Sequence, residues 1–142
     1  MELKRKLQAA GAALFGIGMF TGLWSAAALT GMVKVDVPHL ALAAHINALF
    51  GGLWLIALAM TLKSLHYGDV GRRRLAILTV IPAFGNWAVT LLASFLGVRG
   101  LEYTHDLANN VVAGLLQGVV VVPALVAVSA WVWGFRDIKR AS

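Results

Sequence analysis

The chain has 142 residues, of which 60 % are hydrophobic and only 13 % are charged. A domain of this length has no interior large enough to bury so much apolar surface, so the composition excludes an ordinary water-soluble fold. Cysteine is absent, which excludes disulfides and thiolate metal sites, and the net charge of +6 predicts no nucleic-acid partner because the basic residues lie at the ends of apolar blocks.

Four apolar blocks follow one another along the chain, at about residues 7–32, 40–62, 75–98 and 111–135. Each is long enough to cross a bilayer core of roughly 30 Å, which takes about 20 helical residues. The blocks lack the alternation of membrane β-strands, so they satisfy their backbone hydrogen bonds as helices. The sequence therefore predicts an all-α fold, an integral membrane four-helix bundle that forms a single domain over residues 1–142.

The first block follows a basic start and contains the small residues 25–28, which resemble a signal-peptide cleavage site. It is longer than the apolar region of a signal peptide, about 7 to 15 residues, so we expect a retained helix. The second block begins after the chain-breaking Pro38, the third after the polar stretch 63–74, and the fourth after the stretch 99–110.

Lysine and arginine are distributed unevenly between the two sides that four crossings define. Only Lys34 and Arg99 fall on one side, and the other ten fall on the opposite side: Lys4, Arg5, Lys6, Lys63, Arg72, Arg73, Arg74, Arg136, Lys139 and Arg140. The positive-inside rule therefore predicts that the N and C termini are cytoplasmic. We expect a multi-pass protein of a bacterial-type inner (cytoplasmic) membrane, with the lipid bilayer as its main partner.

Polar side chains inside a membrane span are costly, so they are the best pointers to function. The second block contains His45, the third contains Asn86 and Thr90 one turn apart, and the fourth contains Gln117. Their depths predict that all four meet in one layer in the outer half of the bundle. Hydrogen bonds that merely join helices are the alternative interpretation for the amides and the hydroxyl.

Histidine differs from the other three because imidazole is a common ligand of metals and haem, and no acidic residue lies within a span to pair with it. A ring turned toward lipid or a backbone carbonyl would count against a ligand role for His45. The chain has only this one deep histidine, so a haem here is expected to be five-coordinate, with an open site for Lewis-acid chemistry or a small ligand. A proton-coupled transporter is disfavoured because no carboxylate lies inside a span.

The chain resembles the styrene oxide isomerase family in four short motifs whose order and spacing agree. These are Ala44-His45, Gly51-Gly52, Gly85-Asn86-Trp87-Ala88 and Arg99-Gly100-Leu101. Family members are small four-helix membrane proteins that form trimers and bind haem b through a histidine near the subunit interfaces. There the haem iron acts as a Lewis acid, and an epoxide rearranges to a carbonyl compound without net redox change. The resemblance implies that His45 binds the iron and that Asn86 belongs to the haem pocket.

Two positions depart from the family pattern, since Thr90 stands where the family has a tyrosine and Gly51 where it has an asparagine. The leading hypothesis is a homotrimeric haem b protein that isomerises an epoxide or a related lipophilic small molecule. In it, Asn86 and Thr90 act on the substrate, and Gln117 with Asn86 supports the cofactor held by His45. The alternative is a non-catalytic haem-binding protein or a structural membrane subunit.

Overall fold

The computed structural model describes residues 2–136, which form four long helical segments and contain no β-strand. The segments are α1 (Glu2–Leu29), α2 (Pro38–Thr61) with the short 3-10 turn η1 (Leu62–Ser64), α3 (Asp69–Leu96), and a last segment made of α4 (Leu107–Leu115), the π-helical turn η2 (Leu116–Val121) and α5 (Val122–Trp133). All four segments are long and apolar enough to cross a membrane. The predicted all-α membrane fold is confirmed at this level.

The helices extend beyond the apolar blocks, mostly at their N-terminal ends. α1 begins at Glu2 instead of residue 7, and α3 begins at Asp69 instead of residue 75. Apolarity marks the lipid core, whereas a helix continues into the headgroup region, where its charged first turn is solvated. At its other end α1 stops at Leu29, short of residue 32, and Gly31 then adopts a φ of 74°, which glycine tolerates.

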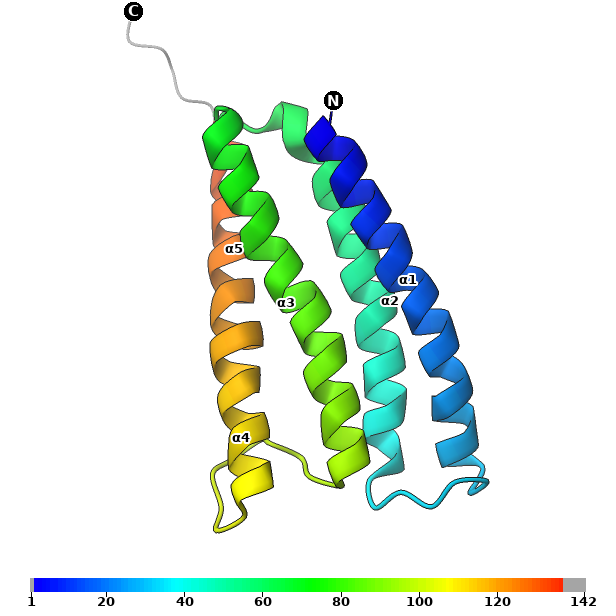
Figure 1. The fold of residues 1–142 in the computed structure, drawn as a ribbon. Helices are drawn as coiled ribbons and strands as arrows, with labels where there is room; N and C mark the ends of the chain where they lie inside the picture. The colour runs from blue at the N-terminus through cyan, green and yellow to red at the C-terminus, as the bar shows by residue number, and fades with distance from the viewer. Residues whose placement is uncertain (1, 137–142) are drawn as a thin grey trace, which may run out of the picture.

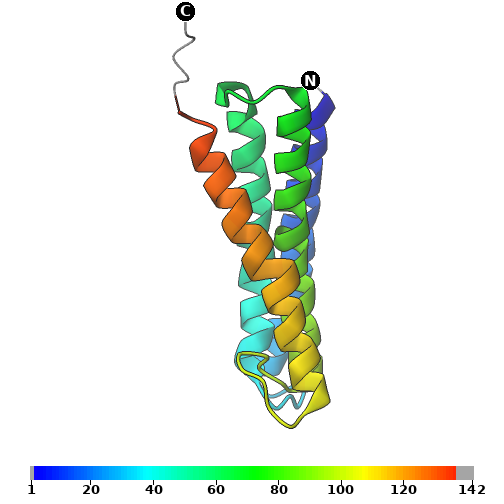
Figure 2. The ribbon, with the colours of Figure 1, turned by 90° about the vertical axis from the view of Figure 1, so that its left-hand side faces the viewer.

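The helices lie in a row, with α1 against α2, α2 against α3, and α3 against the last segment (Figure 1). The last segment crosses the others obliquely (Figure 2). α1 and α5 lie at opposite edges of this row, so the four-helix bundle is open and its first and last segments do not close it into a ring. The last span is also the least covered, with 22 % of its most apolar window buried.

Glycine allows α1 and α2 to pack closely. The buried residues of α1 recur every three or four positions: Leu7, Gly11, Leu14, Gly18, Thr21, Ser25 and Ala28. A Cβ atom on Gly11 would lie 2.7 Å from the carbonyl oxygen of Gly52, and one on Gly52 would lie 2.7 Å from that of Gly11. No larger residue fits there without separating the two backbones, as is common at helix contacts in lipid.

Two tryptophans join α1 to α3. The indole nitrogen of Trp87 donates to Thr21 Oγ1 at 3.0 Å, and that of Trp24 donates to Ser94 Oγ at 3.3 Å. A buried indole N–H needs such a partner in an apolar surrounding. These bonds fix the rotation of α3 about its axis, which sets where its polar residues lie.

The start of α1, the α2–α3 loop and the end of α5 lie at the same end of the molecule (Figure 1). Eight of the ten lysines and arginines in residues 2–136 belong to this end, and the exceptions are Lys34 and Arg99. Lys139 and Arg140 lie outside the described residues. Assignment of this end to the cytoplasm stays a prediction of the positive-inside rule.

Candidate functional site

His45 projects from α2 toward α1. Its Nδ1 lies 2.7 Å from the backbone carbonyl oxygen of Gly18, and because a carbonyl only accepts, Nδ1 must carry the ring proton and donate it. The imidazole also lies against Gly22, where an added Cβ would come within 3.0 Å of the ring. The missing side chain of Gly22 thus makes room for the ring, and the bond to Gly18 fixes its tautomer.

In the neutral form of this tautomer, the other ring nitrogen of His45, Nε2, carries the lone pair. Among residues 2–136 it has no hydrogen-bond partner, and the one buried side-chain nitrogen or oxygen without a partner is Arg72 Nε. Nε2 is therefore not sealed inside the chain. A ring nitrogen bonded to a backbone carbonyl with the other left free is the arrangement typical of metal-bound histidine. The ring is thus turned toward a backbone carbonyl, the contact expected to count against a ligand role for His45. It excludes Nδ1 as the ligand atom, whereas Nε2 stays free.

Asn86 and Thr90 meet Asn47 instead of His45. The amide nitrogen of Asn47 donates to Asn86 Oδ1 at 3.1 Å and to Thr90 Oγ1 at 3.0 Å, and Thr90 Oγ1 lies 3.4 Å from Asn86 Oδ1. The expected meeting of His45 with these side chains is wrong within one chain. Residues 45 and 47 lie about 200° apart around a helix, so one faces α1 and the other faces α3.

Gln117 does not join this cluster either. It lies in η2 and is exposed, whereas Val120 of the same turn is buried and Val119 packs on Gly85 of α3. The valines take the inner face of the turn, which leaves the carboxamide of Gln117 on the outer face. Gly118 beside it has no neighbour within 4 Å of a Cβ position.

A cavity of about 290 Å³ lies between α2, α3 and the last segment. Its polar lining residues are Asn47 and Asn86, and the rest of its wall is Phe50, Gly51, Trp54, Pro82, Ala83, Val120 and Ala124. An added Cβ on Gly51 would lie 3.1 Å from the backbone oxygen of Ala83. A larger residue at position 51 would therefore push against α3, which is the physical reason that glycine suits this chain.

The last segment reaches this cavity through a π-helical turn. Residue 122 donates its backbone N–H to the carbonyl of Gln117, five residues earlier, and Pro123 follows with no N–H to give. Gly85 lets the turn approach α3, since a Cβ there would lie 2.9 Å from Val119 Cγ1. Turns of this kind are frequent at functional sites. The sequence predicted one continuous helix here, and Pro123 was its only hint of the irregularity.

The two amides present complementary atoms to the cavity. Both N–H groups of Asn47 are used, so its Oδ1 remains as a free acceptor, and Nδ2 of Asn86 remains as a free donor among residues 2–136. Exchanging O and N in both amides reverses their roles but still leaves one donor and one acceptor. Sequence reasoning missed Asn47, although it lies on the same face as Gly51, one turn away.

Comparison with known proteins gives two matches. A family model described as styrene oxide isomerase matches residues 3–136. Hydroxylaminobenzene mutase HabB of Ectopseudomonas oleovorans is 27 % identical over an alignment of 142 positions, which covers 95 % of this chain and 82 % of the relative. Both matches span all four helical segments.

Proposed function

The chain belongs to the styrene oxide isomerase family, and from this premise we propose that it is a haem b-dependent membrane isomerase of small aromatic compounds with a labile bond to oxygen. The family, together with the mutase relative, makes it an isomerase-type membrane protein. This proposal compares two substrate classes. The family name indicates an epoxide, and the name of the relative indicates an arylhydroxylamine.

Both classes suit one reaction type. In an aryl epoxide the strained C–O bond breaks, a hydrogen with its electron pair moves to the neighbouring carbon, and a carbonyl forms. In an arylhydroxylamine the N–O bond breaks, oxygen joins a ring carbon, and the displaced ring proton goes to nitrogen. Each product has the formula of its substrate, so neither reaction needs an oxidant or a reductant.

The free donor and acceptor of the Asn86–Asn47 pair are the observation that carries the choice between the classes. An epoxide oxygen only accepts hydrogen bonds, whereas a hydroxylamine N–H and O–H group both donates and accepts. The exposed acceptor of Asn47 would stay unpaired beside an epoxide, and an unpaired buried polar group is costly. We therefore expect the arylhydroxylamine to be the better substrate, in keeping with the departures from the family at Gly51 and Thr90.

The residues around His45 fit a haem. A porphyrin supplies four iron ligands itself, so a single free imidazole nitrogen is sufficient on the protein side, and among residues 2–136 no three His, Asp or Glu side chains cluster to hold a bare ion. Nε2 of His45 would bind the iron, while Gly18 keeps the ring proton on Nδ1. Bound haem supplies a Lewis acid for the departing oxygen.

The chain's own residues orient and protect the substrate. Thr90 and Asn86 accept both N–H groups of Asn47 and so hold its amide plane. The apolar wall of Phe50, Trp54 and Val120 accommodates an aromatic ring. It also keeps water from the electron-poor centre that forms when the bond to oxygen breaks.

A homotrimer completes the site in this proposal. His45 faces α1 and the cavity faces α3 and the last segment, so one chain does not turn both toward the same space. A neighbouring copy brings its cavity to the haem. Gln117 is exposed on the outer face of η2, where lipid would give its carboxamide no hydrogen-bond partner. This supports a neighbouring copy of the chain that covers this face. The proposed location is the inner membrane, with the basic end cytoplasmic.

Absorption spectra and product analysis on the detergent-purified protein test this proposal. We expect a Soret band that shifts with an azole ligand, and conversion of an arylhydroxylamine to an aminophenol faster than conversion of styrene oxide to an aldehyde. A protein with haem that converts neither compound would be the non-catalytic haem protein instead. A protein without a Soret band after haem supplementation would refute the proposal.

A further inference from the structure

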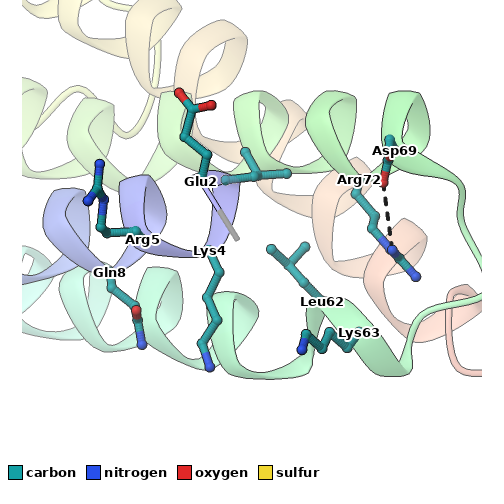
Figure 3. Close-up of a pocket in the computed structure, with 9 residues that line it drawn as sticks. Glu2, Lys4, Arg5, Gln8, Leu62, Lys63, Asp69 and Arg72 are labelled. Atoms are coloured by element: carbon teal, nitrogen blue, oxygen red, sulfur yellow. Dashed lines mark ion pairs between the residues drawn. The ribbon is translucent and has the colours of Figure 1, made fainter.

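The cavity at the basic end of the molecule is larger than the one between α2 and α3. It has a volume of about 670 Å³ and lies where the first two turns of α1 meet η1 and the first turn of α3 (Figure 3). Its lining residues are Glu2, Leu3, Lys4, Arg5, Gln8, Leu62, Lys63, Asp69 and Arg72. Nothing in the proposed isomerase reaction uses these side chains.

Positive charge dominates this basic cavity. Four of its lining residues are cations and two are acids. Glu2 is paired with Lys6, which lies outside the lining, and Asp69 lies 3.8 Å from Arg72 Nη1. Within residues 2–136, Lys4, Arg5 and Lys63 have no ion-pair partner. The acids are therefore engaged, and an unbalanced positive field remains for an anion.

Arg72 supplies the most specific observation. Its Nη2 donates to the backbone oxygen of Leu65 at 3.0 Å, which fixes the guanidinium. Its Nε is buried and is the one such side-chain atom without a hydrogen-bond partner in residues 2–136. Because Nε is closed to solvent, a ligand in the cavity would meet the other nitrogens of the guanidinium, whose side chain lines the cavity and is 28 % exposed. A phosphate oxygen is the acceptor that an arginine binds best.

The apolar part of the cavity indicates the source of the phosphate. Leu3 and Leu62 line it beside the cations. A free phosphate ion gains nothing from such a surface, whereas the glycerol and first methylenes of a lipid do. The position at the end of the membrane spans is the level of the headgroups.

We propose that this cavity binds the phosphate headgroup of an anionic phospholipid, with Arg72 as its central contact and Lys4, Arg5 and Lys63 around it. Basic pockets at the cytoplasmic end of membrane helices bind such headgroups. Arg73 and Arg74, on the same turn of α3, do not line the cavity. They satisfy the topology rule without contributing to this site.

The test uses the full-length purified protein in mixed micelles and measures lipid binding and thermal unfolding. The probes are phosphatidylglycerol, phosphatidylcholine and inorganic phosphate at matched concentration. The variants are Arg72→Gln, the matched control Arg74→Gln, and the double variant Lys4→Gln with Arg5→Gln in case the first fails to fold. We expect phosphatidylglycerol alone to raise the melting temperature, and each cation removed from the cavity to weaken its binding about fivefold.

Arg74→Gln should bind phosphatidylglycerol as the unchanged protein does. Equal weakening by Arg74→Gln and Arg72→Gln would show a general charge effect and overturn the proposed site. A stabilisation that inorganic phosphate reproduces would overturn the lipid as its source. These outcomes do not depend on haem content or turnover, so they are separate from the test of the isomerase function.

Discussion

Replacing Asn47 by leucine tests the chemistry proposed for the α2–α3 cavity. Leucine has nearly the same size but donates no hydrogen bond, so Asn86 and Thr90 lose the two bonds of 3.1 and 3.0 Å. Hydrogen bonds between membrane helices contribute about 0.6 kcal/mol each on average, which predicts a loss of about 1 kcal/mol in unfolding free energy. The substrate loses its acceptor and the fixed orientation of Asn86, worth about 1 to 2 kcal/mol.

The loss of substrate contacts predicts a kcat/KM about 5- to 30-fold lower for an arylhydroxylamine. Steady-state kinetics on the haem-loaded variant measure this, and the Soret band should not change because His45 lies on the opposite face of α2. Ser94→Ala is a matched control, since it removes one bond between helices, from Trp24, away from the cavity. The reasoning would be refuted if Asn47→Leu kept kcat/KM within twofold, or if Ser94→Ala lowered it as much.

Three further predictions concern the cofactor, the helix packing and the oligomer. His45→Ala is expected to abolish the Soret band, and added imidazole should restore it by replacing the lost ring beside Gly22; an unchanged band would exclude His45 as the ligand. Gly11→Val should lower the unfolding free energy by about 2 kcal/mol or more, because its side chain would meet the Gly52 backbone oxygen, whereas Gly16→Ala, which has open space, should be neutral or stabilising in the same thermal assay. Gln117→Leu should weaken the proposed homotrimer while the monomer fold persists, and light scattering in detergent would disprove this if the mass of the complex were unchanged.

The four spans could be predicted from the sequence because lipid requires long, continuous apolar helices. Rotation of each helix was harder to predict. A helix such as α2 is apolar on nearly every side, so its composition does not reveal which face meets α1 and which meets α3. The depth of His45 in the membrane predicted that it lies near Asn86. Depth does not give the rotation of a helix, and in the structure Asn47 contacts Asn86 instead.

The glycine positions of α1 indicate which face of this helix packs on α2. Gly11, Gly18 and Gly22 mark the face of α1 that α2 covers, and Gly22 lies against the histidine ring itself. Glycines spaced four and seven residues apart indicate the face of α1 that packs on α2, and they therefore indicate that His45 faces α1. The π-helical turn beside Gly85 had no comparable signal, because its extra residue depends on packing against α3 and only Pro123 marks it in the sequence.

The cavity beside Asn47 and Pro82 lies among the apolar parts of the spans, and Phe50, one of its lining residues, is 69 % exposed. If a hydrophobic reactant reaches the cavity from the bilayer, the turnover rate depends on the amount of reactant per lipid molecule and not on its molarity in water. Diluting the membranes with extra phospholipid at constant total reactant should therefore slow turnover. Kinetic constants for this protein are meaningful only when the lipid or detergent mole fraction is stated with them.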